Sequence, residues 1–183
     1  MYQGIYTIIE NKKIAKDVFK MIVEGDTKSL TATGQFVNLE IDGLYLRRPI
    51  SVCDYDDSTI TLIYKVVGAG TEIMSTRVAG EKFDILVGLG NGYNTDKSGE
   101  NPLLIGGGVG VPPMYGLCKK LISEGKKPTV ILGFNTADEI FYKEEFEALG
   151  ATVYVTTVDG SVGTKGFVTD VMKNLEYSYF FTC

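Results

Sequence analysis

The 183-residue sequence contains no histidine and only three cysteines. Histidine is the usual general base near neutral pH and a common metal ligand, so its absence excludes a Ser-His-Asp triad and most zinc sites. Cys53, Cys118 and Cys183 are far apart and form no C-x-x-C motif. We therefore expect no disulfide framework, no bound metal and a reducing cytoplasmic setting.

The sequence also lacks a basic run and a membrane segment. Its net charge of −5 argues against binding to a phosphate backbone. The N-terminus has charged residues too early for a signal peptide. The long uncharged run Pro102–Cys118 is interrupted by glycines and by two further prolines, so it is not a membrane span. We expect neither nucleic acid nor a membrane as a partner.

The first half of the chain alternates short strands with turns, which predicts a closed or nearly closed antiparallel β-barrel. A charged turn, Asn11–Lys13, is predicted between the first two strands, and a short helix is predicted over Gly70–Val78, beginning at Thr71. The predicted strands are Tyr2–Glu10, Asp17–Val23, Gln35–Ile41, Ile50–Tyr55, Thr59–Val67 and Lys82–Val87.

Beyond a polar, glycine-bearing segment after Asn91, strands alternate with helices. Such alternation indicates a parallel sheet with right-handed crossovers. We therefore predict a β-barrel domain at residues 1–97 and an α/β nucleotide-binding domain at residues 98–183. The predicted strands of the second domain are Pro102–Ile105, Thr129–Phe134, Thr152–Thr156 and Ser178–Thr182, and its helices are Pro113–Glu124, Lys143–Leu149 and Phe167–Asn174.

The strongest motif is a turn rich in glycine, Gly106–Gly110, between a predicted strand and a predicted helix. Backbone N–H groups, the helix dipole and the missing side chains suit a pyrophosphate there. The spacing departs from G-x-G-x-x-G because Val111 stands where the third glycine would be. The alternative is a tight turn that binds no ligand.

Two further segments in the barrel half could bind anions. Arg47–Ser51 reads RRPIS, in which an arginine could clamp a phosphate and Ser51 could hydrogen-bond a ring nitrogen. Gly68–Thr71 precedes the short predicted helix and is a second possible phosphate site. The alternative for the first segment is a barrel-edge turn with solvated arginines. Anion sites on both halves of the chain suggest two bound nucleotides.

The order of these motifs resembles that of the ferredoxin–NADP reductase superfamily over the whole chain. The motifs are RPIS (Arg48–Ser51), IYK (Ile63–Lys65), GAGT (Gly68–Thr71), GLGNGY (Gly88–Tyr93), GGGVGVPP (Gly106–Pro113) and FFTC (Phe180–Cys183). The segments GGGVGVPPMYGLCKKL and VDGSVGTKGFVTD (Val158–Asp170) more closely resemble the family of electron transfer subunits of bacterial NAD-dependent (class 1B) dihydroorotate dehydrogenase.

The resemblance implies FAD on the barrel and NAD at the C-terminal edge of the parallel sheet. For FAD it implies contacts with Arg48, Pro49, Ile50, Ser51, Ile63, Tyr64, Lys65, Gly70 and Thr71, with Arg48 and Thr71 at the pyrophosphate. For NAD the expected contacts are Gly106, Gly107, Gly108, Gly110, Val111, Pro112, Asp159 and Thr182. Ser51, near the flavin ring, and Cys183, near the nicotinamide, are the candidate catalytic residues. The alternatives are a strand-end core thiol for Cys183 and a solvated strand residue for Lys65.

The function implied is that of an NAD-dependent flavin oxidoreductase subunit in pyrimidine biosynthesis. It would pass electrons between NAD and an FMN-containing dihydroorotate dehydrogenase catalytic subunit, as a hetero-oligomer. A [2Fe–2S] cluster is expected only in the full-length protein, because in that family the FFTC element continues toward the cluster segment, whereas this chain stops at Cys183 and is expected to be truncated before it. The alternatives are another ferredoxin–NAD(P) reductase-like module and a non-catalytic assembly domain.

Carboxylates in two loops of the second half predict a preference for NADH over NADPH. Asp138 and Glu139 follow one predicted strand, and Asp159 follows the next. Carboxylates would repel the 2′-phosphate of NADPH. The alternative is that Asp159 only forms a turn with Gly160.

Overall fold

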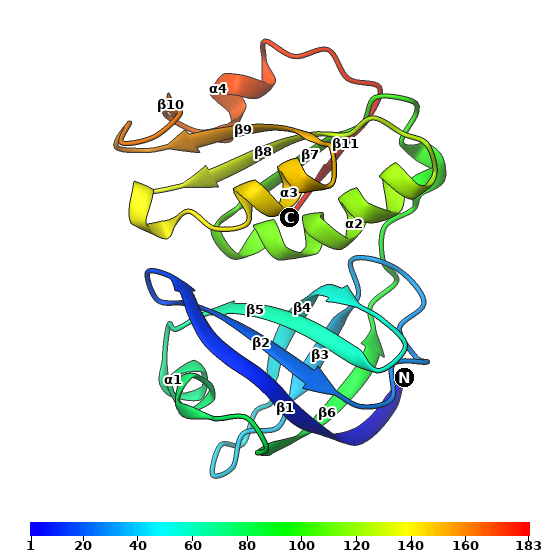
Figure 1. Ribbon diagram of the computed structural model, residues 1–183, viewed down its shortest axis with the longest axis vertical. Helices are drawn as coiled ribbons and strands as arrows, with labels where there is room; N and C mark the ends of the chain where they lie inside the picture. Colours follow the sequence, from blue (N-terminus) through cyan, green and yellow to red (C-terminus); the bar gives the residue numbers. More distant parts are fainter. The chain divides into compact units, whose positions relative to one another are not determined.

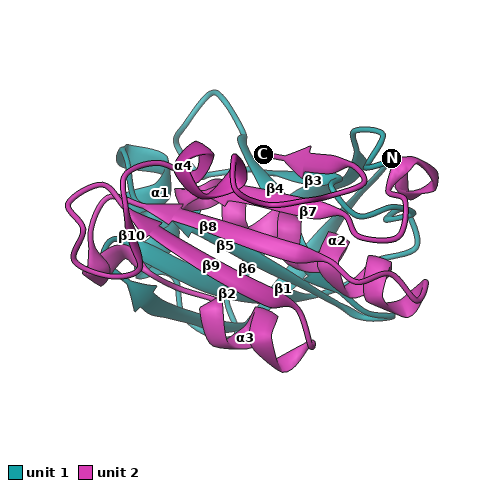
Figure 2. Ribbon diagram, turned by 90° about the horizontal axis from the view of Figure 1, so that it is seen from above, with its two compact units in different colours: residues 1–93 teal, residues 94–183 magenta.

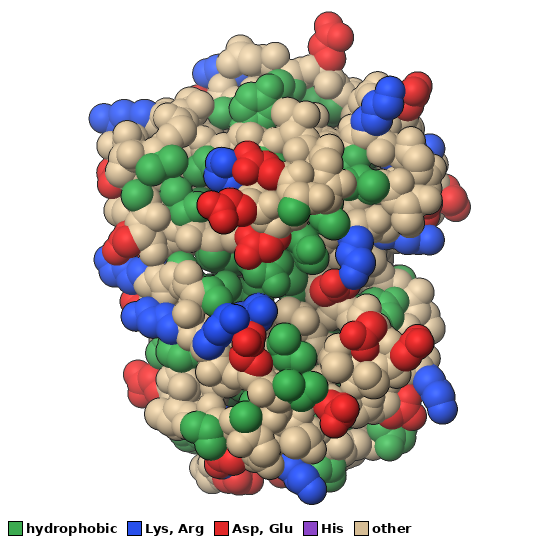
Figure 3. All heavy atoms as spheres, in the orientation of Figure 1, with side chains coloured by type: hydrophobic (Ala, Val, Ile, Leu, Met, Phe, Trp, Pro, Cys, Tyr) green, Lys and Arg blue, Asp and Glu red, His purple; other side chains and the backbone are tan.

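The computed structural model describes all residues, 1–183, as two compact units, Met1–Tyr93 and Asn94–Cys183. Figure 2 shows the two units in different colours. No helix in either unit has both the length and the apolar character needed to cross a bilayer. On the face drawn in Figure 3, acidic and basic side chains are mixed on the surface of each unit.

Unit 1 is a closed antiparallel barrel with the strand order β1-β2-β5-β4-β3-β6 (Figure 1), which confirms the predicted barrel. Its strands are β1 (Tyr2–Ala15), β2 (Val18–Glu24), β3 (Phe36–Leu39), β4 (Arg48–Tyr55), β5 (Thr59–Lys65) and β6 (Lys82–Leu89), and its helix is α1 (Ala69–Thr76).

The barrel forms because apolar side chains alternate along its strands and fill one interior. On β5, Ile60, Leu62 and Tyr64 point into the core, and residues between them point outward. Met74 of α1 is fully buried in the same core, so the helix is packed against the barrel through this side chain. Burying each large apolar side chain contributes about 1.5–3 kcal/mol.

The turn predicted at residues 11–13 is wrong. Strand β1 continues to Ala15 and pairs with β2 through Lys12↔Lys20 and Lys13↔Phe19. The chain reverses only after Ala15, and Asp17 has a positive φ of 55°. Charged residues do not end a strand when its outward positions face solvent. The register shifts in this hairpin also disturb the alternation of inward and outward side chains from which strands are predicted.

Unit 2 is a five-stranded parallel sheet with the order β10-β9-β8-β7-β11, as the alternation of strands and helices predicted. Its strands are β7 (Leu103–Gly107), β8 (Thr129–Phe134), β9 (Thr152–Thr157), β10 (Thr164–Lys165) and β11 (Phe180–Thr182). Its helices are α2 (Val111–Ser123), α3 (Lys143–Ala148) and α4 (Val168–Met172), with 3-10 turns η1 (Thr95–Lys97), η2 (Gly108–Gly110) and η3 (Ala137–Glu139).

Helices cover both faces of this sheet (Figure 1), with α2 and α3 on one face and α4 on the other. The α4 side includes a core of Leu103, Ile105 and Ile131 packed with Val171. On the other face, Tyr115 of α2 contacts Phe146 of α3 edge to face, with ring centroids 5.4 Å apart. The two-residue strand β10 was not predicted, because a Thr-Lys pair flanked by glycines carries no strand pattern.

Two buried tyrosines give the barrel a pH-dependent stability. The Tyr6 hydroxyl donates to the carbonyl of Asp26, and the Tyr64 hydroxyl donates to Asn11 Oδ1 at 2.9 Å. Burial raises the pKa of both phenols to about 12. Because the folded-state pKa lies above the usual value near 10, this contribution is complete below about pH 10. It is lost as the pH rises toward 12.

We predict that Tyr6 and Tyr64 titrate above the usual range for tyrosine. Tyrosinate absorbance should show this late step near pH 12, accompanied by loss of the folded circular dichroism signal. Tyr6→Phe and Tyr64→Phe should each remove one late tyrosine. Titration of Tyr6 and Tyr64 near pH 10, with the fold intact, would contradict the assignment.

Candidate functional site

Two consecutive arginines before and at the start of β4 have different partners. Arg47 Nη1 donates to Asp84 Oδ1 at 2.8 Å, and its Nη2 pairs with Glu40. Arg48 donates to the carbonyl of Leu46 and makes no ion pair. Arg47 is thus held by carboxylates of the barrel, whereas the charge of Arg48 has no carboxylate partner.

The environment of Asp84 shows how firmly Arg47 is held. Burial alone would raise the pKa of Asp84, but hydrogen bonds from Gln3 and Arg47 outweigh burial and keep this pKa below its usual value. The carboxylate is therefore charged at neutral pH and anchors Arg47 to β6.

The guanidinium of Arg48 lies against Gly70 in the first turn of α1. A Cβ atom at Gly70 would come within 3 Å of the Arg48 guanidinium carbon and nitrogens, whereas one at Gly68 would meet nothing within 4 Å. The first backbone N–H groups of a helix have no partner within it, and its dipole is positive there. A cation and a helix N-terminus therefore lie together beside open space, as binding of a diphosphate requires.

Thr71 shapes this turn from within. Its Oγ1 accepts from the N–H groups of Val67, at 2.9 Å, and Gly68, at 3.3 Å, and donates to the Gly68 carbonyl at 2.9 Å. The residue is buried. Its hydroxyl is therefore used by the turn itself, and it fixes the direction of the neighbouring backbone N–H groups.

The residues expected along the flavin divide between the two faces of β4 and β5. The side chain of Tyr64 belongs to the barrel core, so only its backbone can be reached from outside, and the half-buried Ile50 packs against the same core. Ser51, Ile63 and Lys65 alternate with core residues and therefore point away from the barrel core. Ser51 and Lys65 are half-buried there, whereas Ile63 is buried.

In unit 2, the glycines after β7 have two different roles. A Cβ at Gly106 would lie 2.8 Å from Val111 Cα, and one at Gly110 would overlap the Cys183 carbonyl, so both allow close backbone packing. At Gly107 and Gly108 a Cβ would meet nothing within 4 Å. These two positions line open space, and Gly108 has a positive φ of 51°.

The start of α2 offers fewer N–H donors than the sequence analysis assumed. Pro112 and Pro113 have no N–H group, and the N–H of Val111 donates to the Gly108 carbonyl. The donors available to an anion therefore belong to the glycine turn at residues 107–110. The helix contributes mainly its dipole.

Strand β11 brings the end of the chain beside this turn. Thr182 pairs with Ile105 of β7, and the Cys183 N–H donates to the Ile105 carbonyl at 3.2 Å. Cys183 is exposed, whereas Cys53 and Cys118 are buried. Burial raises the pKa of Cys118 to about 12, so this thiol stays protonated and unreactive at neutral pH.

Asp159 joins two loops at the C-terminal edge of the sheet. Its carboxylate accepts from the hydroxyl of Ser161, at 2.6 Å, and from its N–H, at 2.9 Å, and these bonds lower the pKa of Asp159. Ser161 Oγ in turn accepts from the Ala137 N–H at 2.9 Å. Asp159 therefore lies in an exposed turn, and its carboxylate is negatively charged at neutral pH.

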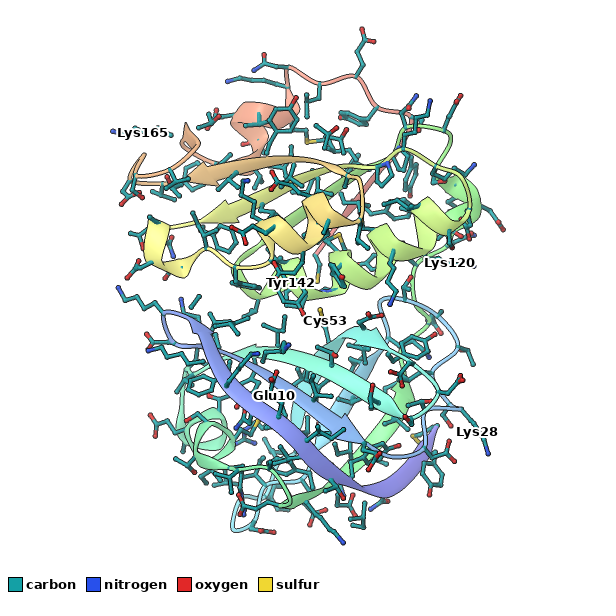
Figure 4. The ribbon with its side chains drawn as sticks, viewed as in Figure 1. Glu10, Lys28, Cys53, Lys120, Tyr142 and Lys165 are labelled. Carbon is teal, nitrogen blue, oxygen red and sulfur yellow. The ribbon has the colours of Figure 1, made fainter.

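Lys165 is a neighbour of this turn that the sequence analysis missed (Figure 4). A Cβ at Gly160 would meet the aliphatic stem of Lys165 at 3.0 Å. The unpredicted strand β10 returns Lys165 to β9, where it pairs with Thr157. The sequence would predict Lys165 near Asp159 only if the short strand β10 were predicted as well.

Comparison with known proteins identifies the family. Residues 104–178 match the oxidoreductase NAD-binding domain. A protein of Fusobacterium nucleatum subsp. nucleatum named dihydroorotate dehydrogenase B (NAD(+)), electron transfer subunit, is 46% identical over 191 residues, covering 97% of this chain and 73% of the relative. A Bacillus mycoides protein of the same name is 41% identical over 186 residues, covering 96% of this chain and 71% of the relative.

This chain belongs to the dihydroorotate dehydrogenase B electron transfer subunit family. The resemblance drawn from the ordered motifs is therefore confirmed.

Solved structures confirm the ferredoxin reductase-like fold of the family. The structure of an NADH-dependent reduced ferredoxin–NADP oxidoreductase, described for flavin-based electron bifurcation, is 33% identical with a TM-score of 0.83. The match covers 94% of this chain and 63% of that one. A ferredoxin NADP+ reductase from Neisseria gonorrhoeae with bound FAD and NADP is 14% identical, with a TM-score of 0.80 over 94% of this chain and 76% of that one. The second match concerns the fold alone.

The glycine turn predicts unequal effects of adding one methyl group. Gly110→Ala should destabilise unit 2 by about 1–3 kcal/mol, because the new Cβ would displace the Cys183 carbonyl. Gly107→Ala is the matched control, since Gly107 has an ordinary extended φ of −111° and its Cβ would meet nothing. Thermal melts of both variants test the prediction, and equal melting temperatures would contradict the tight packing at Gly110.

Proposed function

We propose that this chain binds FAD on its barrel unit and NAD on its parallel-sheet unit, as an NAD-dependent flavin oxidoreductase subunit. It passes electrons between NAD and the FMN-containing catalytic subunit of dihydroorotate dehydrogenase, with which it assembles in the cytoplasm for pyrimidine biosynthesis. Membership of the electron transfer subunit family supports this role. The observation that carries the FAD site is the guanidinium of Arg48, which has no carboxylate partner, beside the first turn of α1.

The barrel residues fit a diphosphate and a flat ring system. Arg48 supplies charge-assisted hydrogen bonds, and the turn shaped by Thr71 supplies backbone N–H groups. Ser51 on the outer face of β4 is the side chain available to hydrogen-bond the flavin ring, whereas the side chain of Ile63 on β5 is buried. Bound FAD supplies hydride and single-electron chemistry, and the protein supplies binding and orientation.

The sheet unit fits a dinucleotide through its strand ends. Gly107 and Gly108 leave the space and backbone donors that a pyrophosphate needs. Asp159, exposed at the end of β9, is available to accept from ribose hydroxyls. Thr182 and Cys183, beside the glycine turn, are placed to contact the nicotinamide end.

The residues of this chain do not fit the iron–sulfur cluster that the resemblance implies for the full-length protein. A [2Fe–2S] cluster is held by four thiolates or by two thiolates with two histidines. No group of three or more potential ligands comes together in residues 1–183. No step of the proposed function is therefore assigned to a cluster here.

The two arginines provide a matched test of FAD binding. Arg48→Ala should weaken FAD binding by roughly tenfold or more, because it loses a charge-assisted contact worth about 1.5–3 kcal/mol. Arg47→Ala should lower thermal stability, because Asp84 and Glu40 lose their ion-pair partner, and should weaken FAD binding less than Arg48→Ala does. Flavin fluorescence on titration of the apoprotein gives the dissociation constants.

Two outcomes would count against this site. An unchanged FAD dissociation constant in Arg48→Ala would remove Arg48 from it. A wild-type chain that is colourless and binds no added FAD would favour a non-catalytic assembly domain.

We also predict that NADH reduces the bound flavin faster than NADPH. Asp138, Glu139 and Asp159 contribute negative charge to the loops expected at the adenosine end, and Lys165, which packs against Gly160, is a cation beside Asp159. Stopped-flow flavin reduction with each nucleotide at equal concentration measures the preference. Lys165→Ala should reduce the rate with NADPH further and leave the rate with NADH unchanged. Equal rate constants for the two nucleotides in the wild type would refute the prediction.

A further inference from the structure

One side chain of β1 joins three separate segments of the barrel. Asn11 Nδ2 donates to the carbonyl of Met74, at 2.8 Å, and to the carbonyl of Arg77, at 2.9 Å. Asn11 Oδ1 accepts from the hydroxyl of the buried Tyr64 at 2.9 Å. Asn11 therefore links β1 to the C-terminal end of α1 and to β5.

The carbonyls that Asn11 binds belong to the place where α1 ends. The last carbonyls of a helix have no N–H partner within it and need donors from elsewhere. Arg77 has an extended conformation, with φ −71° and ψ 144°, so its carbonyl has already left the helix. One amide thus holds both the last turn of α1 and the residue that follows it.

The position of α1 depends on such contacts because the helix is short. A helix of eight residues is unstable on its own, and its placement comes from tertiary interactions. Met74 buries one side chain in the core, and Thr71 ties the first turn to residues 67 and 68. Asn11 is the hydrogen-bonding contact that fixes the opposite end of the helix to β1.

A displacement of α1 would reach the proposed phosphate site directly. The helix spans only about 12 Å at 1.5 Å per residue, so it moves as one body. Its first turn contacts the Arg48 guanidinium at Gly70, with no room for a Cβ between them. Releasing the C-terminal end would therefore change the distance between the first-turn N–H groups and Arg48.

We infer that Asn11 is a positioning residue for the diphosphate of FAD, acting through α1 without touching the cofactor. The inference rests on the FAD site proposed above. Because Tyr64 is bonded to the same amide, Asn11 also orients β5, whose outer face carries Ile63 and Lys65. Asn11 thereby couples the phosphate end of the site to the strand expected along the flavin.

The test compares Asn11→Asp with the wild-type chain. Asp has the same size and keeps the acceptor for Tyr64, but it removes both donors to the α1 carbonyls. The FAD dissociation constant, measured by flavin fluorescence on fully folded protein, should rise by about tenfold. Hydrogen exchange should become faster in residues 69–77 and remain unchanged in β3 and β6.

Gln35→Ala is the matched control for a purely structural role. Gln35 is also a buried amide with three backbone bonds, accepting from Thr31 and Ala32 and donating to Gly90. None of these bonds involves α1 or Arg48. The control should lose stability with an FAD dissociation constant within about twofold of wild type, because the side-chain bonds that it removes join residues 31, 32 and 90 only.

The outcomes separate the inference from the function on which it rests. A wild-type chain that binds no FAD overturns both the proposed function and the inference. A wild type that binds FAD, with an Asn11→Asp dissociation constant no weaker than that of Gln35→Ala, overturns the inference alone. If Asn11→Asp does not fold, Asn11→Ala, which removes the same two donors to the α1 carbonyls, is measured instead. A weakening of about tenfold then supports the inference, and wild-type affinity overturns it.

Discussion

The closure of the barrel by β6 fixes the geometry on which the barrel site depends. Strand β6 pairs with β1 on one side and with β3 on the other, which leaves the barrel without an open edge. Asp84 of β6 accepts from Gln3 of β1 and from Arg47, the residue before β4. Because Arg47 is held there, the next residue starts β4 at a defined position. The guanidinium of Arg48 is thereby brought to Gly70.

The sequence predicted the barrel and the parallel sheet because both depend on local periodicity. The apolar residues of β5 alternate along the strand. Each strand and helix after residue 94 likewise shows its own period within a short stretch of sequence. The turn predicted at residues 11–13 was wrong because these residues become part of β1 only through their pairing with β2. The role of Asn11 is decided still farther away, by the carbonyls of Met74 and Arg77.

The candidate site could be predicted only in part for the same reason. The motif RRPIS presents two arginines that look equivalent in the sequence. They differ because Asp84, which lies 37 residues after Arg47, forms an ion pair with Arg47 and not with Arg48. Thr71 was expected to contact phosphate, but the geometry of residues 67 and 68 uses its hydroxyl inside the turn. A hydrogen-bond partner that is distant in sequence, or that depends on backbone geometry, cannot be predicted from the local sequence.

The two proposed nucleotide sites hold phosphate by different physical means. The barrel site combines the full charge of Arg48 with a short helix, and charge-assisted hydrogen bonds are roughly twice as strong as neutral ones. The sheet site has no cation in its glycine turn, and two prolines remove donors from the start of α2. Neutral N–H groups and a helix dipole bind an anion more weakly. This difference suits the proposed roles, because FAD must remain bound through turnover while NAD must leave after each exchange of electrons.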